Sequence, residues 1–260
     1  MKKLTIISGP CAIENEDTPL LIAEKLKKLS LLLDFNLIFK GSVKKANRTK
    51  LDSFTGIDED EALRILEKVK TEFEIPVTTD IHESADAEKY ASVADCLQIP
   101  AFLCRQTDLL IAAGNTHKAV SIKKAQFASA ESMKFAVDKV RSTGNENIML
   151  IERGTFFGYQ DLVVDFRNIP LLKKIGFPVI VDCTHSLQKP NQSEGVTGGS
   201  PVFIKTIANA AMATGADGLF LEVHPEPSKA KSDGANMLPL EHLEEVLKKA
   251  KDIFNLMNED

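Results

Sequence analysis

The chain has 260 residues, of which 43% are hydrophobic, and a formal net charge of −5 at pH 7. This length and apolar content suffice for a full core, and no linker-like stretch or shift in composition divides the sequence, so we expect one domain over residues 1–260. The negative charge argues against nucleic acid and anionic membranes as partners. Any cations that bind an anionic ligand must therefore be gathered locally.

The amino-terminal segment and the cysteines bear on the compartment. The first apolar run ends at Gly9-Pro10, which is too soon for a signal peptide or a membrane-spanning helix. Four cysteines in a chain of this length do not suggest a disulfide framework, and they are Cys11, Cys96, Cys104 and Cys183. We therefore expect a cytoplasmic protein with reduced thiols.

Eight short apolar runs, rich in β-branched residues, recur along the chain and predict strands. In chain order they cover residues 4–8, 37–41, 76–81, 96–101, 119–124, 148–153, 178–185 and 218–224. Segments with helical periodicity lie between them. Two of these segments begin near Thr18-Pro19 and Ser200-Pro201, where proline suits the first turn of a helix.

Strand-then-helix units in this number predict a particular fold. Eight units within about 250 residues are the signature of an α/β protein with the (β/α)8 TIM barrel fold, whose strands are buried on both faces and read as continuous apolar runs. A doubly wound parallel sheet is the alternative. It gives no reason for eight units, and no G-x-G-x-x-G motif follows the first predicted strand.

A polar residue stands at or just after the end of each predicted strand. The active site of a (β/α)8 barrel lies at the carboxyl ends of its strands. The eight residues there are Cys11, Lys40, Asp80, Gln98, Lys123, Arg153, His185 and Glu222. One such residue is ordinary, because strands leave the core at this point. All eight together predict a polar pocket that contains both cations and metal-ligating groups.

The cations predict a site for an anion. Residues 39–56 contain five basic side chains, for which a solvated loop is the simpler interpretation. Lys123 and Arg153 are different, because each ends an apolar strand, where a buried cation needs a partner or a ligand. If both face the cavity, the ligand is most simply a phosphate. Arg105 follows the fourth predicted strand and could face this cavity or a neighbouring subunit.

A second set, Cys11, His185, Glu222 and Asp233, combines soft and hard ligands and suits Zn²⁺, Fe²⁺ or Mn²⁺. The first, seventh and eighth strands become neighbours when a barrel closes. Each residue alone also has a structural interpretation, as a buried hydrophobe, a core histidine or an ion-pair partner. Cys183 is a rival ligand that ranks second, because a period of two would place it on the strand face of His185.

Several strings in the chain carry a resemblance to a known enzyme family. They are GPCAIE, FK-x-S-x-x-K-ANR, TTDIHE, QIPAFLCRQTDLL, ERGTFFGYQDLVVDFR, DCTHSLQ, and EVHPEP followed by SDGANMLP. From residue 8 to about residue 240 the chain resembles the 3-deoxy-D-manno-octulosonate 8-phosphate synthases, which are (β/α)8 enzymes. The resemblance implies a cytoplasmic transferase of lipopolysaccharide (Kdo) biosynthesis. It would condense phosphoenolpyruvate with D-arabinose 5-phosphate and water, releasing inorganic phosphate.

The resemblance also implies roles for individual residues. The family has a metal-dependent class with cysteine in the first loop, so Cys11 implies one divalent metal ion per subunit. The implied metal ligands are Cys11, His185, Glu222 and Asp233. The implied phosphoenolpyruvate site consists of Lys40, Lys45, Gln98, Ala101, Lys123 and Arg153. The implied pentose phosphate site consists of Asn47, Arg48, Thr49, Asp80, Phe102 and Arg105, the last two supplied across an interface of a homotetramer. The implied catalytic residues are His185, Asp80, Lys45 and Asp233.

Local departures and two alternatives bear on this interpretation. The departures from the family pattern are Val43-Lys44, Thr49 and Thr55, and they affect how the pentose phosphate would be bound. The shikimate-pathway synthase that uses erythrose 4-phosphate is one alternative, but it typically reads K-P-R-T where this chain reads K-A-N-R-T. A non-catalytic barrel that binds metal or phosphate is the other. Whether the metal would orient the aldehyde or hold the attacking water stays open.

Overall fold

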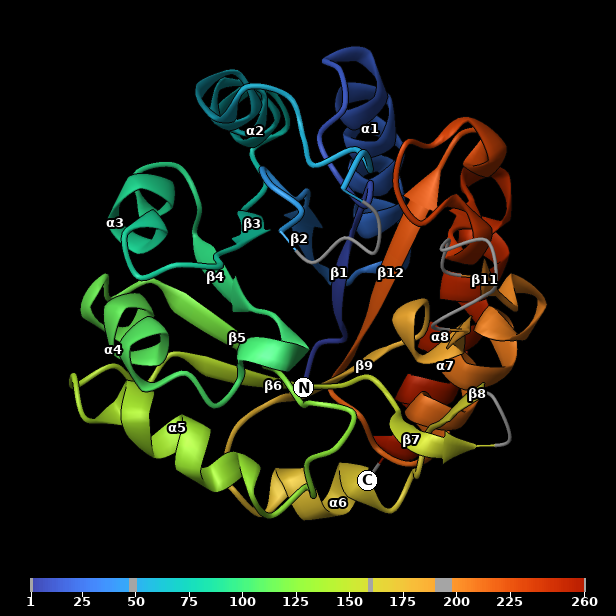
Figure 1. Ribbon diagram of the computed structural model, residues 1–260. Coiled ribbons are helices and arrows are strands. Elements are labelled where there is room, and N and C mark those ends of the chain that lie inside the picture. Colours follow the sequence, from blue (N-terminus) through green and yellow to red (C-terminus); the bar gives the residue numbers. More distant parts are fainter. Residues whose placement is uncertain (1, 47–50, 159–160, 190–197, 260) are drawn as a thin grey trace.

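The computed structural model describes residues 2–46, 51–158, 161–189 and 198–259. Eight parallel strands form a closed barrel, in which β1 pairs with β2 on one side and with β12 on the other (Figure 1). Their bounds are β1 Thr5–Gly9, β2 Asn36–Lys40, β3 Val77–Asp80, β4 Cys96–Ile99, β5 Ala119–Lys123, β6 Ile148–Glu152, β9 Val179–Asp182 and β12 Gly218–His224. The predicted (β/α)8 fold is confirmed, because a doubly wound sheet would leave two open edges.

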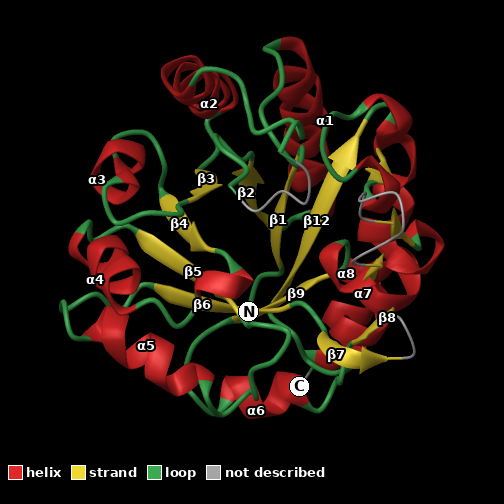
Figure 2. Ribbon diagram, viewed as in Figure 1, coloured by secondary structure: helices red, strands yellow, loops and turns green. Residues whose placement is uncertain are grey.

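Helices surround the barrel as an outer ring (Figure 2). Their bounds are α1 Asp17–Leu33, α2 Glu59–Phe73, α3 Asp86–Ala91, α4 Thr107–Asn115, α5 Met133–Arg141, α6 Asn168–Lys173, α7 Ile204–Ala213 and α8 Leu243–Met257. Each follows one barrel strand, so the connections return the chain to the same end of the barrel before the next strand. Within the described residues, none of these helices combines the length and the apolar character that a membrane crossing needs.

Further short strands lie at the carboxyl end of the barrel. They are β7 Thr155–Gly158 and β8 Asp161–Val163, which pair with each other; β10 Gln188–Lys189 and β11 Gly198–Gly199, which also pair; and β13 Leu238–Pro239, which pairs in parallel with the end of β12. None of them was predicted from the sequence. All belong to the loops after β6, β9 and β12, so these loops build the rim of the barrel mouth.

The core has two parts that follow from strand alternation. Residues that point outward from the strands pack against the helices in one large cluster. Residues that point inward form a smaller cluster of Ile7, Ile151, Ile180 and Phe220 inside the barrel. Phe220 is fully buried and its ring lies directly under the polar mouth, with the Nζ atom of Lys123 at 3.9 Å from the ring centroid. The apolar interior therefore ends where the polar pocket begins.

Helix α2 begins with a side-chain cap that a single substitution can test. The Asp58 carboxylate accepts hydrogen bonds from the backbone N–H groups of Asp60 and Glu61 at 3.1 Å each. Asp58→Ala is expected to lower the free energy of unfolding by about 1 kcal/mol, because these two donors lose their acceptor. Urea-induced unfolding followed by circular dichroism measures the change. Glu72→Ala, an exposed position on the same helix, is the control. An equal loss in both variants would contradict the role of the cap.

Candidate functional site

A pocket opens at the carboxyl ends of the barrel strands. Its lining comes from all parts of the chain and consists of Lys40, Lys45, Asp80, Gln98, Pro100, Ala101, Phe102, Lys123, Gln126, Arg153, His185, Gln188, Glu222 and Asp233. Seven of the eight residues predicted at strand ends are in this set. Cys11 is not in it, but its thiol contacts Asp233, which is.

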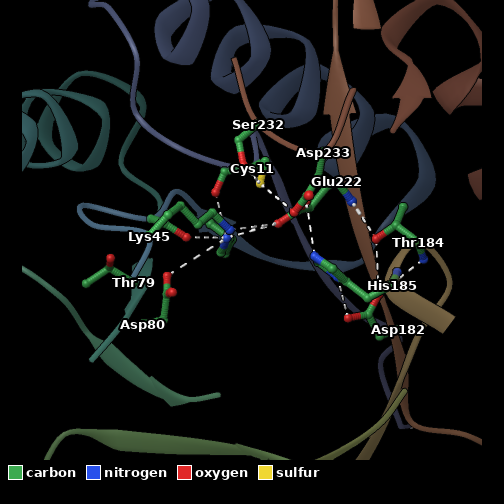
Figure 3. A network of polar contacts seen from close by, with 12 residues as sticks. Cys11, Lys45, Thr79, Asp80, Asp182, Thr184, His185, Glu222, Ser232 and Asp233 are labelled. Carbon is green, nitrogen blue, oxygen red and sulfur yellow. Dashed lines mark hydrogen bonds and ion pairs between the residues drawn. The ribbon is translucent and has the colours of Figure 1, made fainter. Parts of the chain in front are cut away.

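Three potential metal ligands meet at one side of the pocket. Cys11, Glu222 and Asp233 each offer a ligand atom, and these atoms all lie within 4.8 Å of one another. The Sγ atom of Cys11 lies 3.4 Å from Oδ2 of Asp233 and 3.2 Å from Oγ of Ser232 (Figure 3). Cys11 follows β1, Glu222 belongs to β12 and Asp233 lies in the loop after β12, so closure of the barrel brings them together. Sulfur and carboxylate donors at this spacing fit a divalent metal ion.

The electrostatics of this cluster favour a cation. Burial raises the pKa of the Cys11 thiol, and the negative charges of Glu222 and Asp233 raise it further. The thiol therefore stays protonated, and its S–H group donates a hydrogen bond to the Asp233 carboxylate. A divalent cation would take the place of this proton, because metals bind the thiolate form.

Glu222 is the charged centre around which three cationic or potentially cationic groups gather. Its Oε1 atom accepts a hydrogen bond from Lys40 at 3.0 Å and lies 3.9 Å from Nζ of Lys45. Its Oε2 atom lies 3.3 Å from Nε2 of His185. Burial by itself raises the pKa of Glu222, but His185, Lys40 and Lys45 outweigh it and hold the pKa well below its usual range. Glu222 is therefore an ionised carboxylate inside a protein, a state that needs such partners.

Lys40 and Lys45 differ in what their ammonium groups contact. Lys40 donates to the backbone carbonyl of Cys11 at 2.9 Å, to Oγ of Ser42 at 2.7 Å and to Glu222. These three acceptors match the three protons of its ammonium group. Burial lowers the pKa of Lys45, but Cys11, Glu222 and nearby carboxylates raise it well above its usual range, so Lys45 remains charged.

Lys123 and Arg153 lie in the pocket as predicted. Lys123 ends β5 and donates to Oδ2 of Asp182 at 2.6 Å. Arg153 follows β6 and donates through Nη2 to Gln188 at 2.6 Å, whereas its buried Nη1 has no hydrogen-bond partner among the described residues. Burial lowers the pKa of both side chains. A buried guanidinium with an unused donor can bind an anion.

Sequence reasoning missed Asp182, which ends β9. Its carboxylate is fully buried and accepts from Nδ1 of His185 at 2.7 Å as well as from Lys123. Burial alone raises the pKa of Asp182, but His185 and Lys123 lower it far below its usual range. The sequence does contain a signal, because Asp182 is the first polar residue after the apolar run VIV, although the predicted strand extends to His185.

The structure corrects the interpretation of Cys183. Strand β9 ends at Asp182, and His185 lies in a 3₁₀ turn, His185–Leu187. The alternation of side chains therefore does not continue from Cys183 to His185. The Cys183 thiol is buried in the large core, 3.6 Å from the carbonyl of Val181. Neither Cys183 nor His185 belongs to the close group of Cys11, Glu222 and Asp233, but Nε2 of His185 lies in the pocket 3.3 Å from Glu222, whereas the Cys183 thiol does not line the pocket.

The predicted pentose phosphate residues are only partly placed. Asn47, Arg48 and Thr49 lie outside the described residues. Asp80 lines the pocket, and although burial raises its pKa, Lys40 and Lys45 lower it to about 2. Phe102 lines the pocket with 54% of its surface exposed, and Arg105 is exposed and is not part of the lining. Supply of Phe102 and Arg105 across a subunit interface stays a prediction.

Two positions that depart from the family pattern serve the loop after β2. Val43 is fully buried and its backbone N–H donates to Oγ1 of Thr79 at 3.0 Å. The carbonyl of Thr55 accepts from the backbone N–H of Lys45 at 2.7 Å. The third, Lys44, extends outward to Glu59 at 3.4 Å. The loop is thus fixed near Lys45 through contacts that do not depend on an aromatic residue or an arginine at these positions.

Comparisons with known proteins cover nearly the whole chain. Residues 1–259 match the DAHP synthetase I family. The 2-dehydro-3-deoxyphosphooctonate aldolase of Desulfatibacillum aliphaticivorans is 50% identical over 244 residues, which are 94% of this chain and 89% of that protein. The protein of the same name from Synechococcus sp. is 51% identical over 94% of this chain and 86% of its own. The one from Protochlamydia amoebophila is 47% identical over 98% and 92%.

Proposed function

The chain belongs to the DAHP synthetase I family, and from this premise we propose that its pocket condenses phosphoenolpyruvate with D-arabinose 5-phosphate and water. The products are 3-deoxy-D-manno-octulosonate 8-phosphate and inorganic phosphate. Relatives at about half identity over nearly the full chain are named 2-dehydro-3-deoxyphosphooctonate aldolase, which favours this reaction over the one with erythrose 4-phosphate. The structural observation that carries the proposal is the unused Nη1 donor of Arg153, buried in the same pocket as Lys123 and the acidic cluster.

The phosphoenolpyruvate site is formed by buried cations. This substrate carries a phosphate and a carboxylate, so it requires several positive groups. Lys45 supplies one from the loop after β2, and Lys123 and Arg153 supply the others from the ends of β5 and β6. The amide of Gln98 and the backbone near Ala101 add hydrogen bonds along the same wall. Lys40 contributes through Glu222, because its protons are already directed to protein acceptors.

The metal site consists of Cys11, His185, Glu222 and Asp233 and holds one divalent ion per subunit, Zn²⁺, Fe²⁺ or Mn²⁺. Support comes from the close approach of the Cys11, Glu222 and Asp233 ligand atoms and from Nε2 of His185, which faces Glu222 at 3.3 Å. When bound, such an ion acts as a Lewis acid toward the aldehyde or orients the water that adds. Its thiolate and carboxylate ligands neutralise its charge inside the barrel.

The reaction requires alignment and proton movement. C3 of phosphoenolpyruvate attacks the aldehyde carbon, water adds at C2, and phosphate leaves when its C–O bond breaks. The buried cations align the two phosphorylated substrates, and such positioning contributes several kcal/mol to a rate. Lys45 stays protonated and faces the side of the pocket where Glu222 and Asp233 lie, so it balances negative charge on the former aldehyde oxygen. Asp80 orients the sugar, and Nε2 of His185 is placed to move a proton.

Assembly and location follow from the same proposal. We place the enzyme in the cytoplasm as a homotetramer, in which Phe102 and Arg105 reach toward a neighbouring subunit. The exposure of both side chains at the barrel mouth supports this assignment.

Phosphate release with two sugar phosphates tests the proposal. With phosphoenolpyruvate as the other substrate, kcat/KM for arabinose 5-phosphate is expected to exceed that for erythrose 4-phosphate at least about 10-fold, because the one hydroxyl-bearing carbon that erythrose 4-phosphate lacks leaves polar groups of the site unpaired. The opposite preference would assign the shikimate-pathway reaction. No release with either sugar, while the protein still binds metal and phosphate, would make it a binding barrel.

A further inference from the structure

One buried carboxylate reaches both halves of the site. We propose that Asp182 is a positioning residue that holds the His185 imidazole toward the metal cluster and the Lys123 ammonium toward the phosphate site, so that the two binding sites depend on one side chain. This inference rests on the proposed function, because it assigns Asp182 to the metal and phosphoenolpyruvate sites. It concerns a residue that is neither a proposed ligand nor a proposed substrate contact.

The two carboxylate oxygens of Asp182 have different hydrogen-bond partners. Oδ1 accepts from Oγ1 of Thr184 at 3.0 Å and from the backbone N–H groups of Thr184 and His185 at 3.1 and 2.8 Å. These contacts close the turn after β9 and fix the carboxylate. Oδ2 then contacts Nδ1 of His185 at 2.7 Å and Nζ of Lys123 at 2.6 Å. The carboxylate is fully buried, so water does not compete for these positions.

The contact with Oδ2 determines the tautomer of His185. An ionised carboxylate has no proton to donate, so Nδ1 of His185 must carry the proton in this hydrogen bond. Nε2 is then the nitrogen left for the cluster, and it does face Glu222 (Figure 3). A carboxylate behind a histidine also makes the imidazole a better ligand, and loss of such a partner typically weakens metal binding.

Oδ2 of Asp182 also fixes the position of the Lys123 ammonium group. Its ammonium group sits between Asp182 and the face of the Phe220 ring, 3.4 Å from Nδ1 of His185. The ammonium and the imidazole therefore share one negative charge. When an anionic phosphate draws Lys123 toward itself, more of the Asp182 charge acts on His185, which strengthens Nε2 as a ligand. Metal binding and phosphoenolpyruvate binding should then favour each other, and this coupling is reciprocal.

Asp182→Asn tests the proposal directly. The asparagine oxygen can still accept from Thr184, but its NH₂ group would face Nδ1 and Nζ, which repels Lys123 and forces the imidazole proton onto Nε2. The Zn²⁺ dissociation constant, measured by competition with a chromophoric chelator, is expected to rise about 10- to 100-fold. KM for phosphoenolpyruvate should also rise, and added phosphoenolpyruvate should tighten Zn²⁺ binding in the wild-type chain more than in the variant.

Asp217→Asn is the matched control. Asp217 is also buried, accepts a backbone N–H from Val179 at 2.8 Å and pairs with a lysine, but it lies at the amino end of the barrel. It should change stability and leave the Zn²⁺ dissociation constant and KM near wild type. If Asp182→Asn does not fold, Thr184→Val takes its place, because it removes one donor to Oδ1. The same hydroxyl accepts the backbone N–H of Glu222 at 3.4 Å, so the deciding readout for this variant is KM for phosphoenolpyruvate, which should rise through Lys123.

The outcomes separate this inference from the proposed function. Wild-type values for Zn²⁺ and phosphoenolpyruvate in the variant would overturn the role of Asp182, as would equal shifts in Asp217→Asn. A change in only one of the two constants would overturn the shared role. A wild-type chain that binds Zn²⁺ but releases no phosphate would instead overturn the proposed reaction, and the binding constants would still decide the inference.

Discussion

Lys123→Met is expected to lower kcat/KM for phosphoenolpyruvate about 100- to 1,000-fold, the usual loss when one preorganised donor is removed from an active site. Lys123 is only 6% exposed, and its ammonium is held at the pocket by Asp182. Methionine keeps most of the length and packing of the side chain but has no charge. We therefore expect a higher KM for phosphoenolpyruvate and a lower kcat. The metal content should be retained, because the contact between Asp182 and His185 stays intact.

Lys118→Met is the matched control for this prediction. Lys118 directly precedes β5, whereas Lys123 ends it, so the two lysines stand at opposite ends of one strand. In (β/α)8 barrels the amino ends of the strands serve stability and the carboxyl ends serve function. Steady-state assays of phosphate release should find Lys118→Met within about threefold of wild type, given that surface changes are usually mild. An unchanged KM and kcat in Lys123→Met would remove Lys123 from the substrate site.

The fold was predictable because each barrel strand is buried on both faces. Strand β12, Gly218–His224, coincides with the predicted run 218–224, since every residue in it is buried. Strand β9 was predicted to extend to residue 185 but ends at Asp182. There the carboxylate binds the backbone N–H groups of the next residues and turns the chain. The hydrophobic pattern marks Asp182 only as the first polar residue after the run VIV and does not show that its carboxylate turns the chain.

The lining of the pocket was largely predictable, whereas the contacts among its residues were less so. A polar residue at each strand end indicated the pocket lining, because parallel strands in a closed barrel all end at one mouth. The acceptors of Lys40 come from residues 11, 42 and 222, and no sequence spacing connects them. The small strand pairs β7–β8 and β10–β11 also escaped prediction, because each rests on pairing within a loop and not on an apolar run.

Removal of the metal ion by a strong chelator is expected to lower the rate of phosphate release at least about 100-fold, since a bound cation supplies several kcal/mol of charge stabilisation. Without the ion, Cys11, Glu222 and Asp233 bring a thiol and two carboxylates within 4.8 Å, an arrangement with excess negative charge on the side where the aldehyde would react. Zn²⁺, Fe²⁺ or Mn²⁺ added back should restore activity, and elemental analysis should find one ion per chain. An unchanged rate after complete removal would contradict the metal-dependent reaction.

Two cysteine variants locate the ion within the barrel. Cys11→Ala should reduce the bound metal and the activity together, because it deletes the only sulfur donor within the described ligand group. Cys183→Ala removes a thiol that is equally buried but packs into the core beside Val181. It should cost some stability and leave the metal content at one per chain. If Cys183→Ala lost the ion while Cys11→Ala kept it, the ligand group would have to be rebuilt around β9. Because both substitutions delete the same atom, a difference between them reports position alone.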